Sequence, residues 1–236
     1  MNPATGSLVG CHGLRYAWPK AARTLVIDDF DVAQNERLFL CGPSGSGKST
    51  LLGLMAGVLR AASGDVVLMG QGLSSMRPGA RDRFRADHVG YIFQQFNLLP
   101  FLDPVENVLM GCAWSKARRR RAGGVPSSLR MEAVRLLQAL DLDGDAIRRA
   151  RTHELSVGQQ QRVAAARALI GGPELLLADE PTSALDGRSR DAFLHLLLAE
   201  CARHGTGVVF VSHDMSLARH FDRAVTLGSS AQGIEA

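Results

Sequence analysis

The chain has 236 residues, 46% of them hydrophobic, and a formal net charge of +4 at pH 7. This length and apolar content predict one α/β domain with a substantial core. The apolar run at residues 51–59 is far shorter than the ~20 residues that cross a bilayer, so we expect no membrane span in this sequence. Four scattered cysteines without Cys-x-x-Cys spacing argue against a disulfide framework or a zinc site, and the first residues lack the pattern of a signal peptide.

A glycine-rich loop follows the apolar run at residues 38–41, which predicts a buried strand. The loop has the sequence Gly42-Pro43-Ser44-Gly45-Ser46-Gly47-Lys48-Ser49-Thr50, the Gly-x-x-x-x-Gly-Lys-Ser pattern of a P-loop. Glycines let successive N–H groups face phosphates, Lys48 reaches the terminal phosphates, and the Ser49 hydroxyl can bind Mg²⁺. A helix over residues 51–58 is predicted to follow, which completes the expected phosphate site.

A basic run at residues 116–121 raises nucleic acid or anionic lipid as partners. It precedes a cluster of glycine, proline and serine at residues 123–128, which predicts a turn, and helical patterning resumes only at residues 130–140. The simple interpretation is a solvated loop, so we expect no nucleic-acid partner. An anionic membrane face would add about 1 kcal/mol of attraction per basic residue.

Residues 155–159 predict a helix start with an anion site. Ser156 stands three residues before Gln159, the spacing of a capping box, and a helix is expected over residues 159–170 up to a Gly-Gly-Pro break. Gly158 leaves the first turn without a side chain, so N–H groups and the positive end of the helix dipole are open to a phosphate. No lysine and no apolar strand adjoin this turn, so it resembles half of an ATP site.

Two carboxylates follow the next apolar run, at residues 175–178, which predicts another buried strand. Asp179 and Glu180 stand at its end, before the helix-breaking Pro181. In a parallel α/β sheet the carboxyl ends of the strands form the edge where ligands bind. Asp179 is therefore expected to hold Mg²⁺ through water and Glu180 to polarise an attacking water. An acidic loop is the simpler alternative for such a pair taken alone.

Together these segments resemble the nucleotide-binding subunit of an ABC transporter, and the resemblance covers nearly the whole chain. Residues 42–50 match the Walker A motif, residues 175–180 the Walker B motif, and residues 155–159 the signature motif of ABC ATPases. The resemblance implies an α/β fold of the P-loop NTPase (ABC ATPase) class, with a RecA-like core, an amino-terminal antiparallel β portion and an inserted helical subdomain.

The position of the motifs also predicts the domain organisation. We expect a single ABC ATPase domain over residues 1–236, with the core at about 1–93 and 171–236 and the helical insertion at about 94–170. Within that insertion, residues 96–102 are apolar for a loop, which suits a docking groove or a local core.

Four single residues extend the resemblance. Gln94 matches the Q-loop glutamine, which in the family touches Mg²⁺ and the attacking water and senses the membrane partner. Asp186 matches the D-loop, and His213, after an apolar strand expected at residues 208–212, matches the switch histidine that contacts the γ-phosphate. Tyr16 resembles the aromatic that stacks on adenine, with Trp18 as the alternative.

The resemblance implies ATP and Mg²⁺ as cofactors and assigns three sets of residues. The implied catalytic residues are Glu180, His213, Lys48 and Gln94. The implied metal ligands are Ser49, Gln94 and Asp179. The implied ATP-binding residues are Tyr16, Gly42, Pro43, Ser44, Gly45, Ser46, Gly47, Lys48, Ser49, Thr50, Gln94, Ser156, Gly158, Gln159, Asp186 and His213.

One residue departs from the commonest form of the signature motif. Val157 stands where glycine is usual. We expect tolerance of this change, because the contacts of the motif in the family are made by the hydroxyl at the position of Ser156 and the N–H at that of Gly158.

The resemblance also implies partners and a location. ATP is expected between Lys48 of one copy and Ser156 and Gly158 of the other in a homodimer, attached to integral membrane permease subunits on the inner, cytoplasmic face of the plasma membrane. Residues 93–100 resemble the branch that serves lipoprotein release, macrolide export and FtsX-like permeases (LolD/MacB-like), some of which transmit force across the periplasm. An importer subunit for amino acids or similar solutes, or a cell-division ATPase signalling through an FtsX-like partner, is the alternative.

Overall fold

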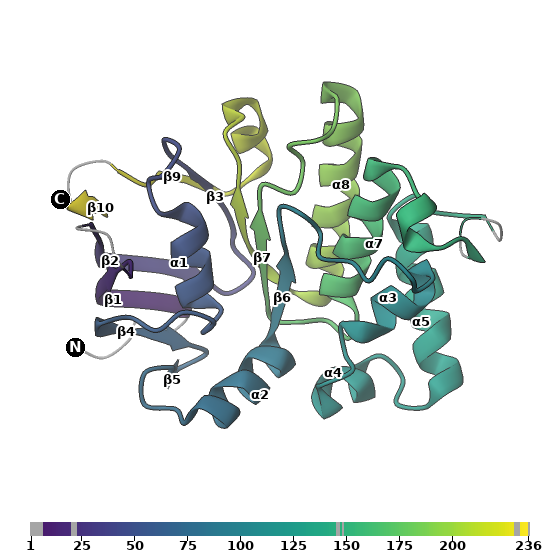
Figure 1. The fold of residues 1–236 in the computed structure, drawn as a ribbon, viewed down its shortest axis with the longest axis horizontal. Coiled ribbons are helices and arrows are strands. Elements are labelled where there is room, and N and C mark those ends of the chain that lie inside the picture. The colour runs from purple at the N-terminus through teal and green to yellow at the C-terminus, as the bar shows by residue number, and fades with distance from the viewer. Residues whose placement is uncertain (1–6, 20–22, 145–146, 148, 229–231, 236) are drawn as a thin grey trace. The chain divides into compact units, whose positions relative to one another are not determined.

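A computed structural model describes residues 7–19, 23–144, 147, 149–228 and 232–235 of the chain (Figure 1). The chain divides into two compact units, which we name the P-loop unit, Met1–Arg85 with Gly207–Ala236, and the helical unit, Ala86–Thr206. In the sequence, helix α2 (Pro78–His88) runs from the first unit into the second.

The P-loop unit contains an antiparallel sheet, as predicted for the amino-terminal portion. Strand β1 pairs with β2 so that Val9 lies opposite Val32 and Cys11 opposite Phe30. All four of these side chains are buried, which is the period-2 pattern of a sheet with one face in the core. The strands in spatial order are β10 (Gln232–Glu235), β2 (Thr24–Ala33), β1 (Ser7–Ala17), β4 (Ser63–Leu68) and β5 (Gln71–Gly72).

Strand β3 (Arg37–Cys41) confirms the buried strand predicted at residues 38–41. It pairs in parallel with β8 (Gly207–Val211) on one side and β9 (Arg223–Thr226) on the other. Its continuous apolar run is typical of a parallel strand that is buried on both faces. The β8 strand begins and ends one residue earlier than the predicted 208–212, and the 3-10 helix η2 (Met215–His220) follows it.

Helix α1 (Lys48–Met55) begins three residues before the predicted start. The lysine of the P-loop is therefore part of the first helical turn. The predicted end at residue 58 was also wrong, because Gly57 adopts a left-handed backbone with a φ of 65° and the chain turns there.

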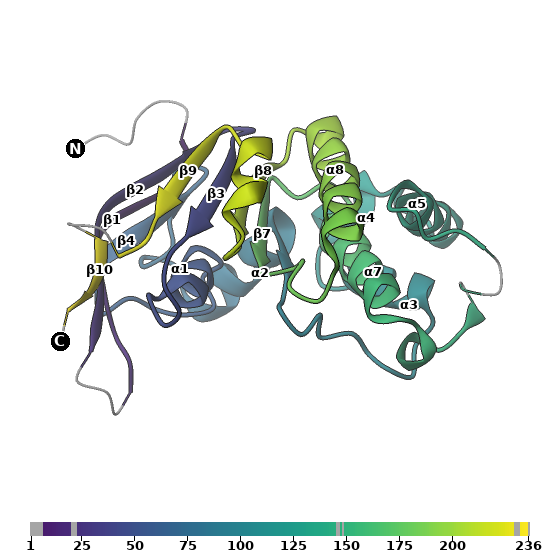
Figure 2. The ribbon, with the colours of Figure 1, turned by 90° about the horizontal axis from the view of Figure 1, so that it is seen from above.

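The helical unit combines two parallel strands with helices. Strands β6 (Val89–Ile92) and β7 (Leu175–Asp179) pair with each other, and α7 packs against β6 and against α3, α5 and α8. Figure 2 shows these helices side by side. The helices are α3 (Pro104–Met110), α4 (Lys116–Arg121), α5 (Pro126–Ala139), η1 (Thr152–Glu154), α7 (Val157–Leu169) and α8 (Gly187–His204).

The interpretation of the basic run at residues 116–121 as a solvated loop was wrong. The run forms helix α4, in which the Ser115 hydroxyl caps the first turn by accepting the Arg118 N–H at 2.9 Å. Arg118 is only 3% exposed, and its guanidinium donates to the carbonyls of Ala168 at 2.6 Å and Ile170 at 2.8 Å. Burial lowers the pKa of Arg118 to about 10. One basic residue therefore satisfies carbonyls at the end of α7, which no local pattern in the sequence indicates.

The turn predicted at residues 123–128 is only half correct. Gly123 and Gly124 have positive φ angles, but Pro126 already occupies the first turn of α5. Proline is favoured there because the first N–H groups of a helix need no partner within the helix.

Two further features concern the cysteines and the apolar helices. All four cysteines are free and buried. Within the ranges that the structure describes, no helix is both long and apolar enough to cross a bilayer.

Candidate nucleotide site

The P-loop connects β3 to α1 through a backbone that needs glycine. Gly42 has a φ of 148°, and a Cβ atom placed on it would lie 2.5 Å from the Leu227 carbonyl oxygen. Gly47 has a φ of 95°, and its Cβ would lie 2.9 Å from a methyl group of Leu25. The loop is therefore shaped by residues far away in the chain as well as by its own glycines.

Lys48 and Ser46 give the loop its polar character. The Lys48 side chain is 6% exposed, and its ammonium donates to the carbonyls of Gly42 and Pro43, each at 2.9 Å. The Ser46 hydroxyl is buried and forms no hydrogen bond within the described part of the chain. A buried hydroxyl without a partner beside a fixed ammonium fits a phosphate group, whose oxygens accept from both. Ser49 is exposed, so its hydroxyl is accessible at the start of α1.

The other predicted residues of the P-loop unit lie at strand ends. Tyr16 is near the end of β1, half-buried, and its ring meets that of Trp18 edge to face at 5.6 Å. The predicted adenine aromatic and its alternative are thus in contact with each other. His213 is exposed and follows β8 by two residues.

In the helical unit, Asp179 ends β7 and is buried, as expected for the carboxylate after the second apolar strand. Glu180 follows with a φ of 47°, a left-handed conformation that costs free energy for a residue other than glycine. Strained backbone of this kind is concentrated at functional sites. Burial raises the pKa of Tyr91, and the negative charge of Asp179 adds to the rise.

The capping box at Ser156 is confirmed. The Ser156 hydroxyl accepts the Gln159 N–H at 3.3 Å, and the Gln159 amide oxygen accepts the Ser156 N–H at 2.9 Å. Helix α7 begins at Val157, two residues before the predicted start, because the two residues between Ser156 and Gln159 are already helical. The box does not use the N–H groups of Val157 and Gly158, so they remain suited to an anion.

Gln94 and Asp186 lie in turns. Gln94 is exposed in a turn that is closed by the Phe96 N–H donating to the Phe93 carbonyl at 2.9 Å. Asp186 caps α8, because its carboxylate accepts the Ser189 N–H at 3.0 Å and the Ser189 hydroxyl at 2.8 Å. These hydrogen bonds lower the pKa of Asp186.

The predicted residues are thus distributed over both units. The P-loop, Tyr16 and His213 belong to the P-loop unit, whereas the remaining predicted residues belong to the helical unit. The predicted metal ligands draw on both units, and they include a single carboxylate, that of Asp179. Within the described ranges no group of three His, Cys, Asp or Glu side chains is arranged to bind a metal.

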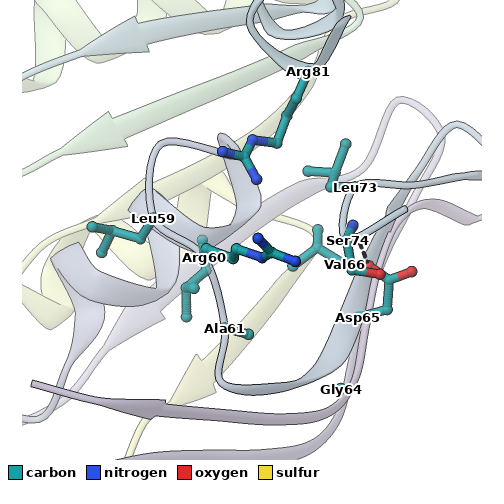
Figure 3. A pocket seen from close by; sticks show the side chains of 10 residues that line it. Leu59, Arg60, Ala61, Gly64, Asp65, Val66, Leu73, Ser74 and Arg81 are labelled. Carbon is teal, nitrogen blue, oxygen red and sulfur yellow. Dashed lines mark hydrogen bonds between the residues drawn. The ribbon is translucent and has the colours of Figure 1, made fainter. Parts of the chain in front are cut away.

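Figure 3 shows a hollow in the P-loop unit that contains none of the predicted residues. Its volume of about 30 Å³ holds only a few water-sized groups, too little for a nucleotide. The Asp65 carboxylate in its wall accepts the Ser74 N–H at 2.9 Å. The remaining lining residues are Leu54, Leu59, Arg60, Ala61, Gly64, Val66, Leu73 and Arg81.

Sequence reasoning missed the polar residues that fix the segment after Gln94. Arg167 of α7 donates to the carbonyls of Phe96 and Asn97, and Asn107, which is fully buried, bonds to Leu99. The one available signal for Arg167 is its position as a cation within the apolar run of residues 163–170. Such a residue needs carbonyl or carboxylate partners once the helix is buried.

Comparisons with known proteins place this geometry in a family context. A model of the ABC transporter family matches residues 27–183. YbbA of Escherichia coli K12, described as an uncharacterized ABC transporter ATP-binding protein, is 42% identical over 196 residues, which cover 83% of this chain and 82% of YbbA. The macrolide export ATP-binding/permease protein MacB of Escherichia coli is 40% identical over 203 residues, which cover 84% of this chain and 29% of MacB.

Solved structures show the same likeness. A dimeric structure of the ATP-binding cassette MJ0796, in a post-hydrolysis state bound to ADP and Pi, superposes with a TM-score of 0.80 at 30% identity. The match covers 93% of this chain and 94% of that one. A second dimeric structure of MJ0796, described as a bacterial ABC transporter cassette, gives a TM-score of 0.80 at 29% identity.

Proposed function

The chain belongs to the ABC transporter family as an ATP-hydrolysing member, and from this premise we propose that it powers a separate membrane permease. The observation that carries the proposal is the P-loop. Its lysine is held between two loop carbonyls, beside a buried serine hydroxyl that forms no hydrogen bond in the described part of the chain. These groups suit the phosphates of ATP.

We assign ATP binding to the P-loop and to the aromatic residue ahead of it. The N–H groups of residues 44–50 and the Lys48 ammonium hold the phosphates, and Tyr16, whose ring meets that of Trp18 edge to face, stacks on the adenine. Mg²⁺, held by Ser49, Gln94 and Asp179, would neutralise charge on the phosphates when bound. The exposed Ser49 hydroxyl and the buried Asp179 carboxylate are the hard oxygen ligands that this ion prefers.

Hydrolysis is an in-line attack of water on the γ-phosphorus of ATP. Glu180, which follows β7 in a left-handed backbone conformation, orients and polarises the water. Lys48 and His213 stabilise charge on the transferred phosphoryl group. Cleavage breaks the bond between the β,γ-bridging oxygen and the γ-phosphorus, so the products are ADP and phosphate.

The second half of each ATP site comes from another copy of the chain. Helix α7 offers the Ser156 hydroxyl and the Gly158 N–H at its positive end, but no lysine. The dimeric arrangement of the similar cassette MJ0796 supports a homodimer with ATP between the copies. Loss of the γ-phosphate then removes contacts that join the two copies.

The permease is supported by the relatives. MacB joins an ATP-binding part to a permease part in one protein, and this chain matches 29% of its length. We propose an export or mechanotransmission role with FtsX-like permease subunits, on the cytoplasmic face of the membrane, in a single ABC domain whose helical insertion spans about residues 94–170. Phe101, which is 60% exposed in residues 96–102, supplies apolar surface for docking.

Substitution of the proposed base tests this scheme. Glu180→Gln keeps the shape of the side chain but cannot accept the proton of water, so it should abolish hydrolysis and trap an ATP-bound dimer. Light scattering with ATP and Mg²⁺ measures the dimer. A monomer under these conditions would count heavily against the proposal. Glu132→Gln on α5, whose partner is Arg135, is the matched control and should hydrolyse ATP normally.

An importer subunit or a cell-division ATPase uses the same chemistry, so the partner decides between them. Copurification of the full chain from membranes, followed by identification of the bound subunit, separates the three roles. An FtsX-like exporter permease supports the proposal, whereas a solute importer or a division protein replaces it.

A further inference from the structure

We propose that Arg167 is a positioning residue that fixes the turn carrying Gln94 to helix α7. The inference rests on the proposed contact of Gln94 with the reacting water and Mg²⁺. Arg167 itself touches neither ATP nor water in this scheme. It acts on the backbone that follows Gln94 and so determines where that amide is presented.

The turn that carries Gln94 has few bonds of its own. The Phe96 N–H donates to the Phe93 carbonyl at 2.9 Å, and the Asn97 N–H donates to the Gln95 carbonyl at 2.6 Å. Gln94 and Gln95 are the two central residues of the turn that the first bond closes, and both are exposed. Two short-range bonds leave a surface turn mobile unless another element holds it.

The backbone after the turn adopts a costly conformation. Phe96 has a φ of 59° and Asn97 a φ of 50°, both in the left-handed region, which asparagine tolerates but which is costly for phenylalanine. The carbonyls of two successive residues with left-handed backbone point to the same side, and each needs a hydrogen-bond donor there. The conformation therefore persists only if surrounding groups stabilise it.

Arg167 supplies that stabilisation. Its Nη1 donates to the Asn97 carbonyl at 2.6 Å, and its Nη2 donates to the Phe96 carbonyl. The planar fork of a guanidinium matches two neighbouring acceptors, and a lysine ammonium lacks this fork. Within the described ranges no carboxylate forms an ion pair with Arg167, so its charge is committed to the two carbonyls.

Arg167 is itself held in place. Its side chain is half-buried, so the bond to the Phe96 carbonyl is partly shielded from water, which strengthens that bond. Its backbone lies against α3 so closely that a Cβ on Gly111 would be 2.0 Å from the Arg167 carbonyl oxygen. A fixed backbone and a rigid fork transmit any displacement of α7 to the turn.

The far side of the same segment is pinned independently. Asn107 accepts the Leu99 N–H at 2.9 Å and donates to the Leu99 carbonyl at 3.0 Å and to the Thr152 hydroxyl at 2.8 Å. The stretch between the turn and α3 thus has one anchor at Leu99 and one at Phe96 and Asn97. Because Ser156 caps the start of α7, movement of this helix shifts the signature serine and Gln94 together.

The test is a double-mutant cycle on ATP hydrolysis by the full chain. Arg167→Met removes the fork and keeps an aliphatic stem, and it should lower kcat about tenfold with the KM for ATP changed less than about threefold. The kcat of Arg167→Lys should lie between that of the parent and that of Arg167→Met. In a Gln94→Ala background, Arg167→Met should lower kcat less than about twofold further, because the group it positions is gone.

The control is another half-buried arginine of the helical unit. Arg135 on α5 bonds to Glu132 and Glu200 and to no predicted site residue. Arg135→Met should lower the Tm while kcat per folded molecule stays unchanged. If Arg167→Met does not fold, Arg167→Lys carries the same cycle, since it keeps the charge and the stem.

Two outcomes overturn the inference in distinguishable ways. If the effects of Arg167→Met and Gln94→Ala multiply, or Arg167→Met keeps full kcat, Arg167 does not act through Gln94, and the proposed function stands. If Gln94→Ala alone hydrolyses ATP at the full rate, the proposed role of Gln94 fails and the inference fails with it.

Discussion

The P-loop and the signature turn are both predicted to present backbone N–H groups to phosphate, but they are built differently. The P-loop depends on distant residues, because the Leu227 carbonyl and the Leu25 side chain leave no room for a Cβ on Gly42 or Gly47. The signature turn is local, because its two bonds join Ser156 and Gln159 only. A local cap can be recognised from four consecutive residues, whereas a tight loop also requires the neighbours that enclose it.

The largest effect is expected from a substitution of Gly42, the P-loop glycine that leaves the least room for a Cβ atom. Gly42→Ala would place a methyl group on the Leu227 carbonyl oxygen and strain the backbone, so ATP binding should weaken by about a hundredfold or more. Titration with a fluorescent nucleotide measures this. Gly79→Ala, in open space on α2, is the control and should bind normally. Normal binding by Gly42→Ala would show that the loop can be rebuilt without glycine.

The second prediction separates capping from phosphate contact at Ser156. Aspartate is as good a cap as serine, so Ser156→Asp should keep the Tm but repel the phosphates and lower ATP hydrolysis at least about a hundredfold. Ser156→Ala should lose about 1 kcal/mol of helix stability and roughly 2–4 °C in Tm. Parallel thermal melts and ATPase assays measure both. If the Ser156→Asp variant hydrolysed ATP at the parent rate, Ser156 would act only as a helix cap and would not contact the phosphates.

A smaller effect is expected at the ion pair of Arg37 and Asp222, at the start of the strand that leads into the P-loop. Arg37, at the start of β3, donates to Asp222, and these bonds lower the pKa of Asp222 from its ordinary 3.8, with burial acting against them. The pair therefore adds stability above that value, which is lost as the pH falls through the lowered folded pKa. Because both side chains are about 40% exposed, the effect is modest.

Asp222→Asn tests this pH dependence. Its Tm should lie below that of the parent at pH 6, and the difference should shrink as the pH approaches 3. Asp82→Asn, which breaks the exposed pair with Arg85 on α2, provides the comparison. If the Tm difference between Asp222→Asn and the parent stayed constant as the pH approached 3, the lost stability would come from packing and not from the charge of Asp222.

The smallest effect is expected at Val157. This side chain is 50% exposed and lies outside the capping box, so Val157→Gly should change ATP hydrolysis less than about twofold and lower stability by about 0.5 kcal/mol. A large change in activity would mean that the side chain itself contributes to the ATP site.

The elements that the sequence predicted well are those with local determinants. The strand before the P-loop, the capping box and the strand before Asp179 were all confirmed, and the similar cassettes confirm the fold class. The basic run at residues 116–121 was misinterpreted because its hydrogen-bond partners are about 50 residues away. The roles assigned to Gln94, Asp186 and His213 stay predictions, since the turns place these residues without assigning their chemistry.

The sequence by itself determined the strand, the glycine-rich loop and the serine cap of the candidate nucleotide site, because glycine spacing and the capping box encode their backbone geometry within a few residues. Only the tertiary structure decided which arginines are structural. Arg118 and Arg167 are used because carbonyls at the end of α7 and after the Gln94 turn need donors. Those carbonyls become neighbours of the arginines only when the helices pack, so no sequence period could identify them.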